Sequence, residues 1–209
     1  EGLLTVIDSF ADRVDPPDRI IYTSSSSVYG DRDGGWVDET DTPDPPTSKT
    51  MVLARAEEIA VEQSAASGID GTVCRFAGLY GPHRYRLDRY LGETVTTGYL
   101  NLVHRVDAAG AIAHLLRAGR GRGEVINIVD DAPTDRHRLA VTLAQMAGHR
   151  PPDRRLLGDR LAEPSLSEAA RQRLAAQKRV SNAKLRSLGY RLRYPTFRSG
   201  YATPIAQRV

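Results

Sequence analysis

Cysteine, lysine and aromatic residues are scarce in this sequence of 209 residues. One cysteine excludes a disulfide framework and a cysteine-rich zinc site, and the five histidines show no metal-ligand spacing, so we expect no metal. No apolar run approaches the ~18 residues of a membrane span, so no membrane partner is expected. No signal-peptide pattern is visible, and we expect a cytoplasmic protein. The remaining composition, 40% apolar and 26% charged, is that of an ordinary globular chain.

The basic residues are almost all arginine. Lysine occurs only at Lys49, Lys178 and Lys184 among 29 basic residues, and the net charge is +3. A nucleic-acid-binding protein usually concentrates basic charge on one face or tail, whereas acidic residues are interleaved with arginine throughout this chain. We therefore expect no nucleic-acid partner. The densest basic cluster, residues 117–123, is interpreted as a glycine-containing turn after a helix.

Apolar runs and amphipathic patterns alternate along the first 76 residues. The spacing predicts a helix over 3–14, a buried strand over 19–23, a long helix over 47–67 and a second buried strand over 72–76. This order is typical of an α/β protein with a parallel sheet.

The pattern changes after Pro82, and we place a soft boundary near residues 81–84. The elements expected beyond it are a helix over 85–97, a strand over 100–104, a helix that Asp107 caps and that runs to Leu116, a strand over 124–128, a helix over 134–148, a loop-like stretch over 149–164, a helix over 167–177 and a turn-rich segment over 180–201.

A serine-rich loop, TSSSSVYG at residues 23–30, follows the first predicted strand. Ligands of open α/β sheets bind at the carboxyl ends of the strands, where hydroxyl groups can hold a carbonyl or alcohol oxygen. An ordinary polar turn explains the same composition equally well. The loop alone therefore does not decide between a binding site and a turn.

Several segments, taken in order, resemble the extended short-chain dehydrogenases/reductases of the nucleotide-sugar epimerase/dehydratase type. The segments are RIIYTSSSSVYG (19–30), WVDET (36–40), CRFAGLYGP (74–82), NLVHRVD (101–107), GEVINI (123–128), KRVSN (178–182) and LGY (188–190). The resemblance covers nearly the whole chain. It implies the α/β class, with residues 1–82 as the C-terminal part of a Rossmann-like dinucleotide-binding domain and residues 83–209 as a smaller α+β substrate-binding lobe whose elements partly return to the core.

The resemblance also implies site residues. Ser25 would hydrogen-bond the reacting oxygen, and the general acid/base is left open among Tyr29, Tyr80 and Tyr85. The cofactor would contact Thr23, Ser24, Phe76, Ala77 and Gly78, and the candidate substrate contacts are Ser26, Tyr80 and Arg84. For Arg84 a solvated surface position is the favoured interpretation, and we interpret His104, at a cleft edge, and Asp107 as structural.

The sequence departs from that family at its catalytic pair, Tyr-x-x-x-Lys. In active members the tyrosine is the general acid/base, and the lysine lowers the pKa of the tyrosine and binds ribose. The matching positions here are Thr50 and Ala54, and residues 31–79 contain no tyrosine. Lys49 and Arg55 flank these positions and could replace part of the charge.

The glycine-rich phosphate-binding loop of the family is also absent, since the glycines of residues 119–123 follow a helix and have the wrong spacing. We therefore interpret the sequence as the C-terminal portion of a longer protein or as a truncated gene product. In either case, the missing upstream residues would hold NAD or NADP. Without such residues, the strand over 19–24 would be a bare apolar edge.

The leading functional expectation is an atypical NAD(P)-dependent epimerase/dehydratase-like oxidoreductase with a small polar or nucleotide-sugar substrate. The alternatives are a non-catalytic NAD(P)-binding sensor or pseudoenzyme and a plain interaction domain. A homodimer through the helices over 3–14 and 47–67 is a further expectation from the resemblance.

Overall fold

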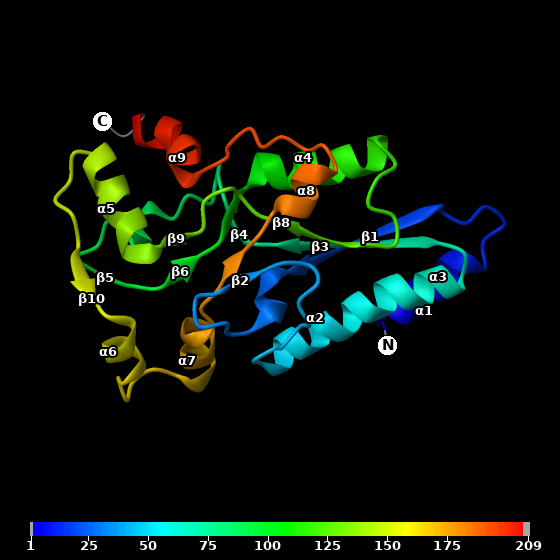
Figure 1. The fold of residues 1–209 in the computed structure, drawn as a ribbon, viewed down its shortest axis with the longest axis horizontal. Helices are drawn as coiled ribbons and strands as arrows, with labels where there is room; N and C mark the ends of the chain where they lie inside the picture. The colour runs from blue at the N-terminus through cyan, green and yellow to red at the C-terminus, as the bar shows by residue number, and fades with distance from the viewer. Residues whose placement is uncertain (1, 207–209) are drawn as a thin grey trace.

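A three-stranded parallel sheet forms the centre of the molecule in the computed structural model, which describes residues 2–206 (Figure 1). Its strands are β1 (Arg19–Ser25), β3 (Asp70–Phe76) and β8 (Val125–Ile128), in the order β1-β3-β8. The register pairs Ser25 with Phe76 and Phe76 with Ile128, so the three strands end at the same edge. The predicted strands and the α/β class are confirmed.

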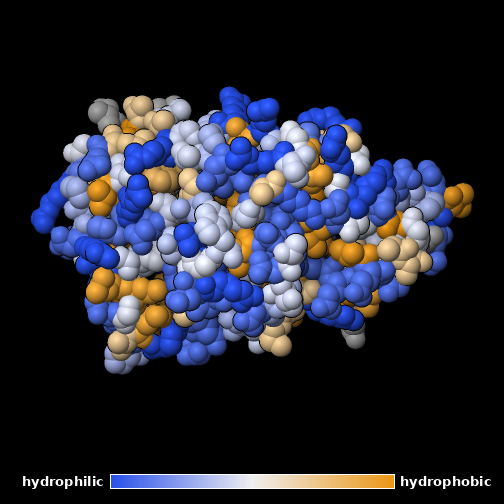
Figure 2. Space-filling view, in the orientation of Figure 1, coloured by the Kyte–Doolittle hydropathy of each residue, from blue (hydrophilic) through white to orange (hydrophobic). Residues whose placement is uncertain are grey.

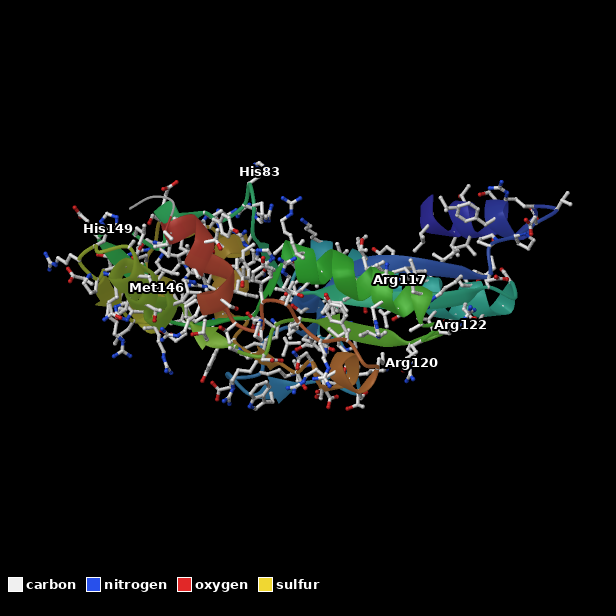
Figure 3. All side chains as sticks on the ribbon, turned by 90° about the horizontal axis from the view of Figure 1, so that it is seen from above. His83, Arg117, Arg120, Arg122, Met146 and His149 are labelled. Atoms are coloured by element: carbon white, nitrogen blue, oxygen red, sulfur yellow. The ribbon has the colours of Figure 1, made fainter. Side chains whose placement is uncertain are left out.

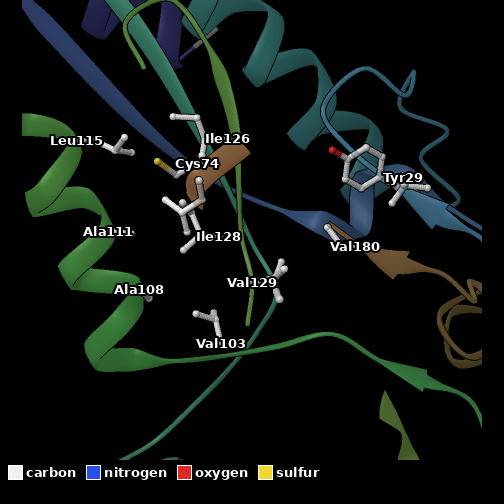
Figure 4. Packing of buried hydrophobic residues seen from close by; sticks show 13 residues of the cluster. Tyr29, Cys74, Val103, Ala108, Ala111, Leu115, Ile126, Ile128, Val129 and Val180 are labelled. Carbon is white, nitrogen blue, oxygen red and sulfur yellow. The ribbon is translucent and has the colours of Figure 1, made fainter. Parts of the chain in front are cut away.

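Helices cover both faces of this sheet (Figure 1). One face carries α1 (Gly2–Ala11) and α2 (Ser48–Glu58), which continues as the π-helical η2 (Ile59–Gln63) and then α3 (Ser64–Ala66). The other carries α4 (Arg105–Arg117), whose small residues Ala108 and Ala111 let the helix approach the sheet closely. Figure 4 shows these alanines facing the buried side chains of β3 and β8.

Gly71 explains how the π-helical stretch comes so near to β3. A Cβ atom at this position would collide with the backbone oxygen of Ala60 in η2. The sequence pattern indicated a helix here but not its π-helical turn, because apolar spacing does not report a one-residue change in hydrogen bonding.

A second apolar cluster lies at the other end of the molecule. It contains Tyr80, Leu102, Leu139, Tyr201 and other buried residues. The helices η3 (Leu87–Arg89), α5 (Arg136–Met146) and α9 (Phe197–Ala206) contribute to this cluster. The second half of the chain also contains α6 (Leu157–Leu161), α7 (Glu168–Ala175) and α8 (Ala183–Ser187), and Leu185 of α8 belongs to the cluster at the central sheet. Paired short strands connect them: β4 (Gly78–Tyr80) with β7 (Leu102–His104), β10 (Asp153–Arg155) with β5 (Thr94–Thr96), β11 (Arg179–Val180) with β2 (Trp36–Val37), and β6 (Tyr99–Leu100) with β9 (Thr134–Asp135).

The boundary predicted near residues 81–84 stays a prediction. Both β8 and α4 follow it in sequence and yet belong to the central sheet and its covering layer. The second half of the chain therefore contributes to both apolar clusters.

Three expectations about the second half were wrong. Residues 85–97 are not a helix, because Arg86 is left-handed and the β-branched run over 94–96 pairs with β10. That pairing also places a strand, followed by α6, in the stretch expected to be a loop. The segment over 180–201 is more regular than expected, since β11, α8 and the start of α9 fall within it.

Asp107 does not cap α4, contrary to expectation. The helix begins two residues earlier, and the Nδ1 atom of His104 accepts the backbone N–H of Val106 at 3.3 Å. The Asp107 carboxylate instead accepts the backbone N–H groups of Arg193 and Tyr194, at 2.7 and 2.8 Å. Asp107 thus anchors the segment before α9 to α4.

The surface is mostly hydrophilic, with apolar residues scattered over the face in Figure 2. The basic cluster after α4 forms the predicted turn, in which Gly119, Gly121 and Gly123 have positive φ angles. Figure 3 shows Arg117, Arg120 and Arg122 together at that end of the molecule, whereas His83 and His149 lie far from them. Among residues 2–206, no helix is both long enough and apolar enough to cross a bilayer.

Candidate functional site

A cleft of about 960 Å³ opens where β1 ends, beside the start of α2 and of α7. Both helices lie in the lower part of Figure 1. Seven hydroxyl-bearing and three cationic side chains line it together with one carboxylate. The lining residues are Thr23, Ser24, Ser25, Ser27, Pro46, Thr47, Ser48, Lys49, Thr50, Leu53, Glu168, Ala169, Gln172, Arg173, Ala176 and Lys178. The cleft therefore combines the serine loop with residues from near the C-terminal end of the chain.

Ser25 is oriented to donate a hydrogen bond into this cleft. Its Oγ accepts hydrogen bonds from the backbone N–H of Ser27 at 3.2 Å and from the Ser27 hydroxyl at 2.9 Å. These bonds occupy both lone pairs of Ser25 Oγ, so its own proton is directed elsewhere. Within the described residues this proton has no acceptor, so it is free for an oxygen atom of a ligand.

Ser24 and Thr23 also lie on the cleft wall. Ser24 is 7% exposed, and its Oγ has no hydrogen-bond partner among residues 2–206. A buried hydroxyl without a partner is unfavourable unless a ligand or water supplies one. This orphaned hydroxyl marks the wall of the cleft as a place for a polar group.

The first turn of α2 faces the same cleft and contains Thr50, the tyrosine position of the family's catalytic pair. Thr47 and Thr50 form a reciprocal capping box, in which Thr47 Oγ1 accepts the N–H of Thr50 at 3.2 Å and Thr50 Oγ1 accepts the N–H of Thr47 at 3.0 Å. Thr50 therefore acts as a helix cap where a tyrosine would carry a proton. Ala54, one turn later, has no group that could hold ribose.

Lys178 enters the cleft from the segment between α7 and β11. Its Nζ donates to the carbonyl of Gly30 at 2.8 Å and to that of Ala176 at 3.4 Å. Burial lowers the pKa of this ammonium group to about 8. Sequence reasoning gave Lys178 no role in the site, although its position within KRVSN and the scarcity of lysine were available signals.

Tyr29 and Ser26 do not line this cleft. Tyr29 is fully buried, and its hydroxyl donates to Oδ1 of Asn127 at 2.9 Å. Burial raises the pKa of Tyr29, which disfavours the tyrosinate that a general base would need. The catalytic role predicted for Tyr29 stays a prediction, and the structure places its hydroxyl in a polar network below the serine loop.

That network joins five parts of the chain. Arg75 lies over the Tyr29 ring, 4.7 Å from its centre, and donates to the Glu57 carboxylate through Nη2 at 2.6 Å and Nε at 2.9 Å. Glu39 accepts the backbone N–H of Asn127 at 2.7 Å, and burial raises the pKa of this carboxyl. Sequence reasoning missed these bonds because they join residues far apart in the chain.

The other predicted site residues lie beyond the ends of β3 and β8. Phe76 is the last residue of β3, and Ala77 and Gly78 follow it, but none of the three lines the 960 Å³ cleft. Tyr80 is buried and stacks on Tyr201, with ring centres 4.9 Å apart, and burial raises its pKa.

Arg84 and Tyr85 are also separate from the cleft. The Nε of Arg84 donates to the carbonyl of Leu79 at 3.0 Å, and the Tyr85 carbonyl accepts the Tyr201 hydroxyl at 2.8 Å. Of the predicted site residues, the cleft therefore brings together Thr23, Ser24 and Ser25.

A second cavity, of about 410 Å³, lies between the end of β8 and α8. It is lined in part by Asp130, whose Oδ1 accepts the N–H of Ala132 at 3.0 Å and whose Oδ2 has no partner within the described residues. Burial raises the pKa of Asp130 to about 7. No group of three potential metal ligands occurs among residues 2–206.

This buried carboxyl makes stability depend on pH. Folded Asp130 binds its proton more tightly than the unfolded residue, so stability is expected to fall as pH rises from about 4 to about 7, by at most ~1.4 kcal/mol per unit. Asp130→Asn should flatten this slope and raise the free energy of unfolding at pH 8. Urea unfolding at pH 5, 6, 7 and 8, with the exposed Asp12→Asn as control, measures it. Identical slopes for Asp130→Asn and the parent would contradict it.

The fold is that of an epimerase/dehydratase-type protein, and the chain belongs to the NAD dependent epimerase/dehydratase family, whose family model matches residues 1–129. It is 38% identical over 136 residues to the protein YeeZ of Escherichia coli K12, in a match covering 64% of this chain and 48% of YeeZ. The chain thus spans about half the length of the curated relatives it matches.

Solved structures share this fold. A conserved protein of unknown function from Silicibacter pomeroyi DSS superposes with a TM-score of 0.83 and 28% identity over 99% of this chain and 73% of that one. Two more distant structures share the fold and carry a dinucleotide. They are dTDP-glucose 4,6-dehydratase of Bacillus anthracis with NAD (TM-score 0.73, 16% identity, 98% of this chain and 64% of that one) and RMD of Pseudomonas aeruginosa with NADPH (0.75, 16%, 99% and 71%).

Proposed function

We propose that this chain belongs to an NAD(P)-dependent oxidoreductase of the epimerase/dehydratase type, which acts on a small polar or nucleotide-sugar substrate. The chain would provide the part of the active site that binds the reacting oxygen of the substrate. The observation that carries the proposal is the free donor of Ser25, held by two hydrogen bonds from Ser27 at the mouth of a large cleft. A fixed donor aimed at a carbonyl oxygen stabilises the negative charge that develops there during reduction.

The residues present fit one end of a dinucleotide. The orphaned hydroxyl of Ser24 and the exposed Thr23 offer polar contacts of the kind a nicotinamide amide can use. When bound, the nicotinamide supplies the hydride chemistry. Ala54 offers nothing to its ribose, and the glycine-rich loop that would hold its pyrophosphate does not occur in this sequence.

The substrate oxygen also needs a proton during reduction. Thr50 cannot supply it as a tyrosine would, because its hydroxyl is committed to the cap of α2 and does not ionise near neutral pH. The family's usual acid is therefore missing from its own position, and this is the feature that makes the protein atypical.

A second candidate function is a non-catalytic NAD(P)-binding sensor. The observation that favours it is the replacement of both members of the catalytic pair, at Thr50 and Ala54, within an otherwise well-formed helix and cleft. Such a protein would bind the dinucleotide and respond to it without turning substrate over.

One experiment separates the two functions. The protein expressed from its complete reading frame is titrated with NADH and NADPH by fluorescence and then assayed for their oxidation with a panel of carbonyl compounds and sugar nucleotides. Binding with turnover of one panel member supports the oxidoreductase. Binding without turnover across the panel supports the sensor, and absence of binding overturns both.

A further inference from the structure

The cleft has an excess of positive charge that no role has yet explained. Lys49, Arg173 and Lys178 line it against a single carboxylate, that of Glu168. Lys49, Arg173 and Glu168 are exposed, so water screens them. Lys178 is different because only 7% of its surface is exposed.

Lys178 is a buried cation without an anionic partner. Its two hydrogen-bond acceptors are neutral carbonyls, and it forms no ion pair with any described residue. Asp31 and Arg32 act on the pKa of Lys178 in opposite directions, and burial, which lowers this pKa, dominates. Because an ammonium has three donors, one of its N–H bonds remains for an acceptor in the cleft.

The start of α2 adds two more donors to the same cleft. The capping box satisfies the N–H of Thr50, while the N–H groups of Ser48 and Lys49 precede the first intrahelical bond and have no acceptor among residues 2–206. The amino end of a helix of this length attracts negative charge. The unpartnered hydroxyl of Ser24, which is 7% exposed, is an independent sign that a polar ligand group belongs here.

We propose that Lys178, Ser24 and the N–H groups of Ser48 and Lys49 form an oxyanion-binding subsite, which holds a carboxylate or phosphate of the substrate. The substrate class would then be an anionic carbonyl or alcohol compound, with its reacting oxygen at Ser25 and its negative group at the start of α2. This inference rests on the proposed function, since it names the substrate of the same cleft. Lys178, which follows α7, supplies the positive charge that α2 lacks at Ala54.

Direct binding of simple anions tests the subsite without requiring turnover. Inorganic phosphate and acetate are titrated separately into the ¹⁵N-labelled full chain, and the amide resonances of Ser48 and Lys49 are followed. We expect both resonances to shift and saturate with at least one of the anions. The anion that binds more tightly indicates whether the substrate carries a phosphate or a carboxylate. No saturable shift at these amides with either anion overturns the proposal.

Two variants probe the donors individually. Lys178→Met removes the charge and retains the length, and we expect it to weaken anion binding at least tenfold, whereas Lys184→Met, outside the cleft, should not change it. Ser48→Pro removes one N–H at the first helical position, where proline is accepted after the extended Thr47, and should also weaken binding. Ser48→Ala is its matched control because it loses the hydroxyl but retains the N–H.

The outcomes are distinguishable from those of the dinucleotide experiment. Unchanged anion affinity in both Lys178→Met and Ser48→Pro overturns the subsite even if NADH or NADPH binds. If Lys178→Met fails to fold, Ser48→Pro against Ser48→Ala decides alone. Anion binding without any dinucleotide binding overturns the proposed function and leaves the subsite in place.

Discussion

Replacing Arg75 with methionine is expected to lower the free energy of unfolding by about 3–5 kcal/mol. The Arg75 and Glu57 side chains are 5% and 4% exposed, and they share three hydrogen bonds of 2.6–3.2 Å. Removing the guanidinium leaves the Glu57 carboxylate buried without a counter-charge. It also removes the cation that lies over the Tyr29 ring. Urea unfolding followed by circular dichroism at pH 7 measures the change.

The double variant Arg75→Met with Glu57→Leu is the control for this prediction. It removes both charges, so no isolated charge stays buried, and it should regain most of the stability lost in the single variant. A single variant as stable as the parent would show that Glu57 takes up water or a proton at little cost. A double variant no more stable than the single one would place the loss in packing against Tyr29.

Replacing Ser25 with alanine is expected to lower kcat/KM of the proposed oxidoreductase about 10²–10³-fold, the range found when one preorganised donor to a developing oxyanion is removed. The Ser25 hydroxyl has both lone pairs occupied by Ser27, so its proton is the group that a substrate oxygen would meet. Steady-state assays with the substrate identified in the panel measure the effect.

The stability of this variant must be measured beside its activity, because Ser25 also caps η1 (Ser26–Tyr29) and its loss can cost about 1 kcal/mol. Ser27→Ala is the matched control. It removes one of the bonds that orient Ser25 but retains the donor, so we expect less than a tenfold loss. Equal kcat/KM in Ser25→Ala and the parent would falsify the role assigned to Ser25.

The central sheet was predictable because its strands are short, nearly continuous apolar runs. Such runs are typical of strands buried on both faces, and the residues of β3 and β8 are largely buried. The segment over 85–97 was not predictable in the same way. Its residues 94–96 become a strand through pairing with residues 153–155, a contact that local spacing does not encode.

The candidate site was predictable only where it is local in sequence. The serine loop follows a recognisable strand, so its position at the sheet edge follows from the order of elements. Lys178 lines the cleft although it is far from the serine loop in sequence. The burial of Tyr29 depends on Asn127, Arg75 and the strands that carry them. Long-range packing decides such positions, and a single sequence read on its own contains little trace of it.

The contact between Lys178 and the Gly30 carbonyl spans 148 residues, and it has a consequence for synthesis. While the ribosome is still making the chain, the serine loop can form together with β1 and α2, but its opposite wall does not yet exist. A nascent chain stalled before Lys178 would therefore present the hydroxyls of the loop to solvent without a closed cleft. The cleft is complete only after the chain has been translated through Lys178. A ligand can therefore bind in the complete cleft only after that residue has been made.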